Sequence, residues 1–167
     1  IVGDLRVELE MGKPLFNFEN IPLSKSVDPT NITLEINKIK FAGGFCVNIG
    51  NPHIIFFVKH CFEHDLKIIG PKIENHDLFP EKTNVTFAQV LDKQNIKVNV
   101  WERGAGLTKA CGTAACATAV AGFEKKLTLN KVDIKFNEGL LNIRIDNYNN
   151  VFMTGPDSKI KDIKIEI

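Results

Sequence analysis

Alternation of apolar and polar residues runs through most of this sequence and predicts short strands. Residues 4–10 place two leucines and a valine on one side and charged residues on the other, which is the pattern of a half-buried strand. The same alternation recurs at 32–36 and at 160–167. Two apolar runs, 45–49 and 54–58, have the length of buried strands and are separated by a Gly-Asn-Pro-His segment.

Two further pairs of strands are predicted around polar turns. Residues 84–91 and 95–101 are rich in branched and aromatic side chains and are joined by an Asp-Lys-Gln turn. Residues 132–136 and 140–145 flank an Asn-Glu-Gly segment, which has the composition of a hairpin turn. The chain is therefore expected to consist mostly of strands.

One long segment breaks the alternation. Residues 111–126 are rich in alanine and lack proline, which predicts a helix. Residues 61–75 also predict a helix, interrupted at Gly70-Pro71, and a flexible Gly-Ala-Gly loop at 104–106 precedes the alanine-rich segment. Many strands with one long central helix predict an α+β fold.

The composition fits one folded domain and excludes several function classes. A chain of 167 residues can bury a single core. Its net charge is +1 at pH 7, so no strongly basic surface predicts binding to nucleic acid. No apolar run approaches the roughly 20 residues that a membrane-spanning helix needs. We therefore expect neither nucleic acid nor a membrane as a partner.

The four cysteines predict a reducing environment. Their spacing, at 46, 61, 111 and 116, matches neither Cys-x-x-Cys nor any other zinc-site pattern, so no metal is expected. The sequence shows no leader of basic and then apolar residues, and the interpretation is a cytoplasmic protein with free thiols. Taken singly, each cysteine is most often a buried core residue.

The start of the alanine-rich helix is the most informative place in the sequence. Cys111 lies where a glycine-bearing loop enters the helix, and the free backbone N–H groups there attract anions. The same field is expected to lower the thiol pKa from about 8.5 toward neutrality. Gly112 lets a ligand carboxylate approach the backbone closely. From these residues alone, a reactive thiol and a small buried residue at a helix cap both stay open for Cys111. Glu102-Arg103 taken alone is more often a surface pair.

Four short segments resemble motifs of the diaminopimelate epimerase family. The stretch from Glu102 to Ala117, with Glu-Arg-Gly followed by Ala-Cys-Gly-Thr, resembles the second cysteine motif of that family. Residues 47–53 resemble its Gly-Asn-Pro-His segment, 79–85 its Phe-Pro-x-x-x-Asn-Val segment, and 153–156 its closing motif. The four segments follow the family's order and span nearly the whole chain.

This resemblance implies a fold and a partner. Family members consist of two similar halves, each with mostly antiparallel strands wrapped around one central helix in a barrel-like arrangement. Residues 1–155 are thus expected to form the C-terminal epimerase domain, and 156–167 a strand that returns to the N-terminal half. The family's earlier Ala-Cys-Gly-Asn motif is missing from this sequence. The resemblance therefore implies a C-terminal half, whose partners are the N-terminal half and a second copy in a full-length homodimer.

The resemblance also implies an activity. The family converts LL- to meso-diaminopimelate, on the way to lysine and peptidoglycan, without pyridoxal phosphate, another cofactor or a metal. One cysteine removes the α-proton while a second returns a proton on the opposite face. By motif, Cys111 is one of the two, and Glu102 lies beside it and holds the substrate ammonium. A half with one cysteine is expected to be inactive alone.

The remaining site residues follow from the same motifs. His53 is expected to face the missing half and support the other cysteine, although without the resemblance it is favoured as a structural histidine that braces a turn. Backbone N–H groups of Gly112 and Thr113 are expected to bind the reacting carboxylate. The distal carboxylate is expected to bind Arg103, whose planar guanidinium can donate two parallel hydrogen bonds. Asn51 and Asn84 are expected to complete this pocket.

Two other functions stay open. Proline racemases share the two-half fold and the paired cysteines, but their second motif carries Asp-Arg-Ser-Pro-Cys where this chain has Glu-Arg-Gly. Phenazine-pathway isomerases lack the cysteine. A non-catalytic domain that binds carboxylates is the second alternative. The combination of Cys111 with Glu102 and Arg103 favours the epimerase.

Overall fold

A computed structural model describes residues 6–156 of the chain, which fold into one large sheet and two helices. The helices are α1 (Leu66–Glu74) and α2 (Gly112–Glu124). The strands, in chain order, are β1 (Arg6–Gly12), β2 (Ile32–Ile36), β3 (Ile39–Asn48), β4 (Pro52–Phe57), β5 (Asn84–Asp92), β6 (Asn95–Glu102), β7 (Gly106–Thr108), β8 (Lys131–Phe136), β9 (Gly139–Ile145) and β10 (Val151–Pro156).

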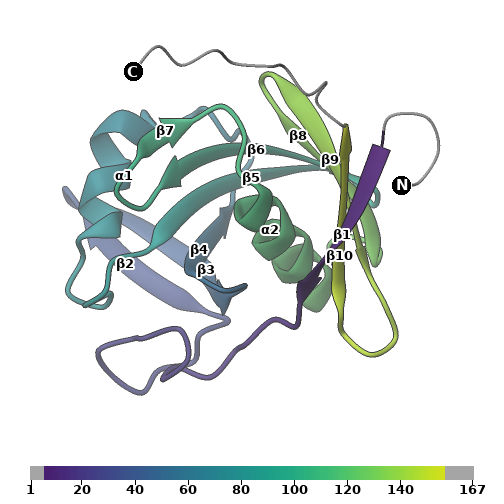
Figure 1. Cartoon of the computed structure of the whole chain (residues 1–167). Coiled ribbons are helices and arrows are strands. Elements are labelled where there is room, and N and C mark those ends of the chain that lie inside the picture. The colour runs from purple at the N-terminus through teal and green to yellow at the C-terminus, as the bar shows by residue number, and fades with distance from the viewer. Residues whose placement is uncertain (1–5, 157–167) are drawn as a thin grey trace, which may run out of the picture.

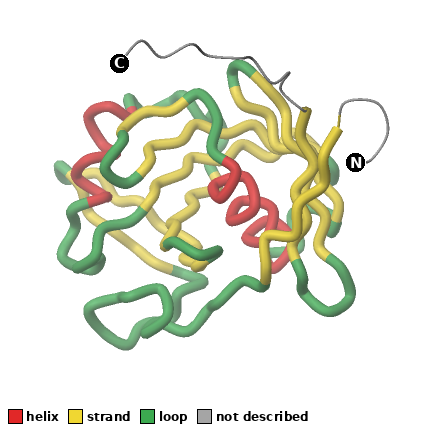
Figure 2. The backbone as a smooth tube through the Cα atoms, viewed as in Figure 1, coloured by secondary structure: helices red, strands yellow, loops and turns green. Residues whose placement is uncertain are grey.

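The sheet is mostly antiparallel and curves around α2. Its strand order is β1-β10-β9-β8-β6-β5-β4-β3-β2, with β7 paired to β6 beside that path. Among the described pairs, β4–β5 and β6–β8 are parallel. Parallel neighbours need a crossover connection, and α1 and α2 lie in these two connections. The predicted α+β class, with strands wrapped around one central helix, is confirmed (Figures 1 and 2).

Helix α2 lies in the hollow of the sheet and forms the centre of the main core. Every residue from 114 to 122 is buried, and most of them are alanine, so the surrounding strands can approach closely. The helix contacts strands at both ends of the sheet path, including β3, β4, β9 and β10. Strand β6 contributes Ile96, Val98 and Val100 to this core.

The opposite face of β6 packs against α1. Trp101 joins a second apolar cluster, formed by α1, β2 and the outer faces of β4 and β5. A Cβ atom on Gly70 would lie only 2.6 Å from Cγ of the Trp101 ring. Glycine therefore lets α1 lie directly on the indole, which explains why a helix-weakening residue stands in the middle of α1.

The prediction for α1 needs correction. The helix begins at Leu66 rather than at residue 61, because Asp65 caps it by accepting a hydrogen bond from the Lys67 N–H (2.9 Å). It also runs through Gly70-Pro71 without a break. Tertiary packing on Trp101 and the second cluster overrides the local propensity that predicted an interruption.

Other differences concern short strands. Residues 106–108, partly within the predicted flexible loop, form β7, and the unpredicted β10 joins β9 to β1. Strand β4 begins at Pro52, two residues before the predicted apolar run. The predicted strand at 160–167 lies outside the described residues, as does all of segment 156–167 except Pro156, the last residue of β10.

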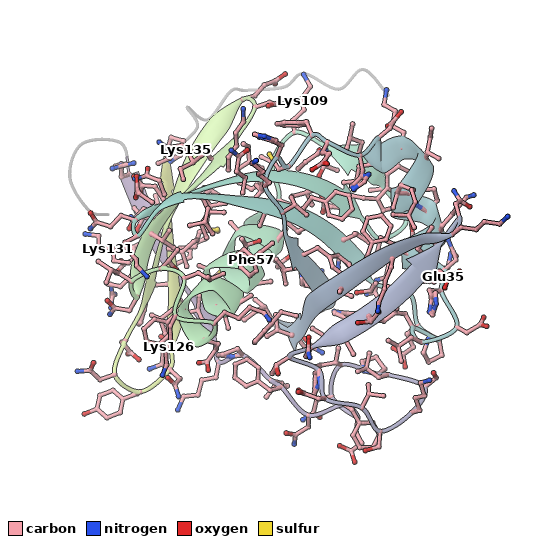
Figure 3. The ribbon with its side chains drawn as sticks, turned by 180° about the vertical axis from the view of Figure 1, so that it is seen from behind. Glu35, Phe57, Lys109, Lys126, Lys131 and Lys135 are labelled. Carbon is pink, nitrogen blue, oxygen red and sulfur yellow. The ribbon has the colours of Figure 1, made fainter. Side chains whose placement is uncertain are left out.

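Four lysines of the described strands and loops point away from the core. Lys109, Lys126, Lys131 and Lys135 extend outward from the ribbon (Figure 3). Within residues 6–156, no helix is both long and apolar enough to cross a membrane.

We predict that Gly70→Ala destabilises the fold. Alanine favours a helix by about 1 kcal/mol over glycine, but its methyl group would overlap the Trp101 ring. Overpacking costs typically about 1–3 kcal/mol, so the free energy of unfolding measured in urea should fall. Ile68→Ala, at an exposed position on the same helix, serves as the control and should change it by less than about 0.5 kcal/mol. A Gly70→Ala variant as stable as wild type would contradict this packing.

Candidate active site

Cys111 is the residue that caps the start of α2. Its backbone is extended (φ −148°, ψ 114°), and its carbonyl accepts the first helical hydrogen bond, from the Ala115 N–H. The first N–H groups of a helix have no partner within it, so those of Gly112 and Thr113 are placed to meet a ligand. The Cys111 Sγ lies 3.5 Å from the Thr113 hydroxyl. The predicted position of the cysteine at the helix start is confirmed.

Strand β10 reaches the same helix end. A Cβ atom on Gly112 would lie 3.0 Å from Sδ of Met153. Glycine at this position therefore leaves room for the thioether beside the first turn of α2. The closing motif at 153–156 was recognised in the sequence, but no contact with the cysteine motif was predicted from it.

The hairpin of β6 and β7 brings Glu102 to Cys111. Glu102 is the last residue of β6 and pairs with Gly106 in β7, after which the chain leads directly into α2. The Glu102 carboxylate interacts with the thiol closely enough to raise its pKa. The expectation that Glu102 lies near Cys111 therefore agrees with the structure.

The pKa of the Cys111 thiol departs from the sequence-based expectation. Burial raises it above its ordinary value, and Glu102 raises it further, while the Thr113 hydroxyl and the Ala114 N–H lower it. The predicted lowering toward neutrality is therefore wrong for this chain, because desolvation outweighs the helix terminus. Burial also raises the pKa of Cys46 and Cys61, and that of Cys116 to about 12.

A second polar region lies beside Arg103. A cavity of about 350 Å³ is lined by Arg103, Asn51, Asn48 and Glu81, together with the chain at 19–22. The Arg103 guanidinium donates to the Glu81 carbonyl (2.9 Å). The structure thus brings together Arg103 and Asn51, as predicted, and adds the backbone of Glu81, which no sequence signal had marked.

Asn84 holds this region together and does not line the cavity. It is buried, its Nδ2 donates to the Pro52 carbonyl (2.8 Å), and its Oδ1 accepts the Arg103 N–H (2.9 Å). The predicted direct role in the pocket therefore changes to a bridge between the turn at 50–52 and the loop at 103. Because the side-chain N–H and the side-chain oxygen of this buried amide both form hydrogen bonds, Asn84 fixes the distance between the two segments.

His53 is also an internal residue. Its ring is fully buried, and its Nε2 lies 2.8 Å from Oδ1 of Asn51. Burial, and the nearby Arg103 guanidinium, lower the pKa of His53 to about 3, so the ring is neutral and Nε2–H is the donor to Asn51. These contacts match the structural alternative, a histidine that braces the turn at Asn51. The expectation that His53 faces the missing half and supports its cysteine stays a prediction.

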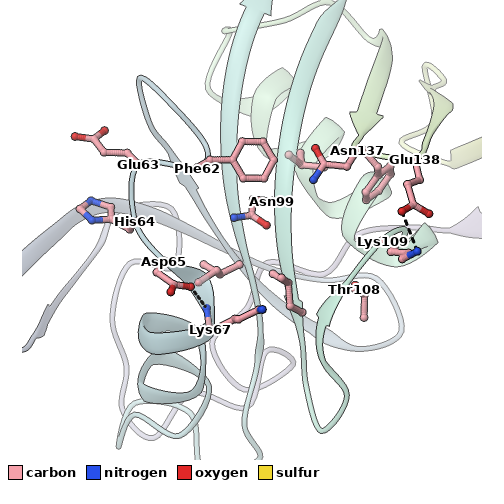
Figure 4. Close-up of a pocket in the computed structure, with 14 residues that line it drawn as sticks. Phe62, Glu63, His64, Asp65, Lys67, Asn99, Thr108, Lys109, Asn137 and Glu138 are labelled. Atoms are coloured by element: carbon pink, nitrogen blue, oxygen red, sulfur yellow. Dashed lines mark hydrogen bonds and ion pairs between the residues drawn. The ribbon is translucent and has the colours of Figure 1, made fainter.

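Another cavity lies away from these groups. It measures about 810 Å³ and is lined by the segment at 62–67, β6 at Val98 and Asn99, residues 107–109 and the β8–β9 turn (Figure 4). Lys109 and Glu138 form an ion pair at its rim (2.8 Å). None of Cys111, Glu102 and Arg103 lines it, so it does not belong to the candidate site.

Comparison with known proteins identifies the family. The family model described as diaminopimelate epimerase matches residues 45–160, more than half of the chain. A protein named diaminopimelate epimerase from Pelagibacter ubique (strain HTCC1062) is 55% identical over 170 aligned residues, which cover 100% of this chain. The chain belongs to the diaminopimelate epimerase family. A further relative of that name, from Wolbachia sp. subsp. Drosophila simulans (strain wRi), is 44% identical over 92% of the chain.

The chain is shorter than these epimerases. It covers 62% of the Pelagibacter protein and 58% of the Wolbachia protein. Two solved structures share its fold: a probable proline racemase from Agrobacterium radiobacter K84 (TM-score 0.64, 9% identity, 96% of this chain and 54% of that chain) and a protein described as a predicted epimerase from Pseudomonas aeruginosa (0.56, 16%, 90% and 55%). At such low identity these two structures support the epimerase fold alone.

We predict that iodoacetamide labels Cys111 before the other three cysteines of the folded chain. Cys111 is 7% exposed, whereas the others are fully buried. Glu102→Gln should accelerate labelling at pH 7–8, because removing that negative charge lowers the pKa of Cys111 and increases the thiolate fraction. Labelling rates by mass spectrometry, with Glu124→Gln as the control, test this. Earlier labelling of Cys46, Cys61 or Cys116 would contradict the predicted order.

We predict that His53 makes the fold less stable in mild acid. Its pKa is lowered in the folded state, so the unfolded chain, with a pKa of about 6.5, binds a proton that the folded chain does not. Stability is full above that value and falls below it, by about 1 kcal/mol between pH 6 and 5. His53→Gln should flatten this slope in urea unfolding, and exposed His60→Gln should not. Equal slopes for wild type and His53→Gln would rule out the neutral buried ring.

Proposed function

We propose that this chain is one half of a diaminopimelate epimerase, and that Cys111 is one of the two acid–base groups that invert the α-carbon. The observation that carries this proposal is the position of Cys111, which caps α2 beside Glu102 and is the least buried of the four cysteines. A second, similar half supplies the other cysteine. The substrate is LL-diaminopimelate and the product is the meso isomer.

In this proposal the substrate lies with its reacting end at the start of α2. The N–H groups of Gly112 and Thr113 bind the carboxylate of the reacting carbon, where negative charge develops as the proton leaves. A thiolate takes the α-proton and becomes a thiol, and the thiol on the opposite face gives a proton to the planar carbanion. No cofactor takes part in this scheme. Met153 packs against Gly112 and limits water beside the reacting carbon.

In one direction of the reaction Cys111 acts as the acid and must start as a thiol, which its raised pKa favours. In the other direction Cys111 acts as the base and must start as a thiolate. We propose that the substrate ammonium binds Glu102, which offsets the carboxylate charge that raises the pKa of Cys111 in the free chain. Binding of the substrate thus favours the thiolate when it is needed.

The other end of the substrate fits the cavity at Arg103. Arg103 and Asn51 line it, and a guanidinium suits a distal carboxylate because it can donate two parallel hydrogen bonds. Asn84 and His53 act as positioning residues, one through the Arg103 backbone and the other through the Asn51 side chain. A substrate with a carboxylate at each end would therefore span the two polar regions.

We predict that the chain alone does not exchange the α-proton of diaminopimelate. One thiol cannot serve both faces of a carbon held in place, and positioned groups can be worth on the order of 10⁵ M or more in effective concentration over solvent. The measurement is deuterium incorporation from D₂O at the α-carbon, first with this chain and then with the separately made remainder of the epimerase added. Activity should appear only in the mixture, and Cys111→Ala should abolish it.

Cys116→Ala is the matched control, since that thiol lies inside the core, and it should retain activity if the variant folds. Exchange by the chain alone that survives Cys111→Ala would refute the two-cysteine scheme. Exchange of proline but not of diaminopimelate by the mixture would favour a racemase. Binding without exchange in the mixture would favour a carboxylate-binding domain.

A further inference from the structure

A carboxylate at the end of α1 is buried beside the loop that carries Glu102 and Arg103. Glu74 is the last residue of α1 and is only 5% exposed. Glutamate is rarely buried so completely unless it is paired. Glu74 does not line the Arg103 cavity, so its burial needs another explanation.

Both oxygens of Glu74 accept hydrogen bonds from residues that flank the site. Oε2 accepts from the indole Nε1–H of Trp101 at 2.7 Å, and Oε1 accepts from the Gly104 N–H at 3.0 Å. Trp101 directly precedes Glu102, and Gly104 directly follows Arg103. A single buried carboxylate therefore holds both sides of the dipeptide that the proposed function assigns to the substrate.

Besides the pairing of Glu102 with Gly106 and the hydrogen bond from the Arg103 guanidinium to the Glu81 carbonyl, the loop has two further anchors. Arg103, Gly104 and Ala105 are exposed, and Gly104 has a positive φ of 76°. Asn84 holds the Arg103 N–H, and the Ala105 N–H closes the turn on the Glu102 carbonyl. Lys82 lies 4.0 Å from Glu74 but is about half exposed, so this ion pair is weak. The two N–H donors are the main partners of the buried charge.

We infer that Glu74 is a positioning residue, which fixes Glu102 and Arg103 at the spacing that the substrate's ammonium and distal carboxylate require. This inference rests on the proposed function. Leaving a buried carboxylate without its donors is costly, so the loop conformation that satisfies both oxygens is strongly favoured over others. The loop is thus ordered before the substrate arrives, and binding does not have to order it.

The test compares Glu74→Gln with wild type in the full chain, with Glu63→Gln, an exposed residue before α1, as the control. Glutamine has the same shape but one carbonyl oxygen, so one of the two N–H groups faces an NH₂ group. Amide exchange of Gly104 and NMR titration with meso-diaminopimelate give the two readouts. Trp101, the only tryptophan, reports the environment of the indole by fluorescence.

Glu74→Gln should increase the amide exchange rate of Gly104 about tenfold and raise the dissociation constant for meso-diaminopimelate about tenfold. This is the size expected for losing one charge-assisted hydrogen bond. Glu63→Gln should change neither. Unchanged Gly104 exchange would overturn the inference, and so would faster exchange with unchanged affinity. If Glu74→Gln does not fold, Trp101→Phe removes the indole donor while keeping an aromatic ring, and the same two readouts decide. A wild-type chain that does not bind diaminopimelate contradicts the proposed function, while Gly104 exchange still decides whether Glu74 holds the loop.

Discussion

Helix α2 can be stable in this sequence only if the sheet encloses it. Nine consecutive residues, 114–122, are buried, and none offers a charged group to solvent. The one polar side chain among them is Thr118, whose hydroxyl donates a hydrogen bond to the Ala114 carbonyl (2.7 Å). A helix of this kind has no polar face, so strands must cover it all round. Only its ends stay accessible, and the candidate site lies at its first residues.

Strand β6 links the enclosed helix to the rest of the site. Its inward side chains pack on α2, and its outward Trp101 packs under Gly70 of α1. Because side chains alternate along a strand, one short segment fixes both helices and ends in Glu102. The β7 return then leads the chain to Cys111. The approach of Glu102 to Cys111 therefore depends on the pairing of β6 and β7 rather than on a long flexible loop.

Burial competes with the helix terminus for control of the thiol. A helix start stabilises a thiolate, but taking the charged form out of water destabilises it. For Cys111 the second effect is larger, and the neighbouring Glu102 adds to it. His53 follows the same logic, since burial keeps the ring neutral and leaves it to hold Asn51. In both cases the folded environment decides the protonation state of a residue whose position in the chain suggested another one.

The sequence by itself determined the strands that alternate, the long alanine-rich helix and the cysteine at its start, because these depend on local periodicity and on helix capping. Its motifs also determined the family and the grouping of Glu102 with Cys111. Tertiary structure alone decided the continuity of α1 through Gly70-Pro71, since only contact with Trp101 explains a glycine there. It also decided that Asn84 bridges two segments and does not line the cavity at Arg103. Likewise, only the fold brings the Glu74 carboxylate to the loop at Gly104, which lies 30 residues away in sequence. Hydrogen bonds between distant segments, and the desolvation that shifts a pKa, arise only when the chain is folded, so no local pattern encodes them.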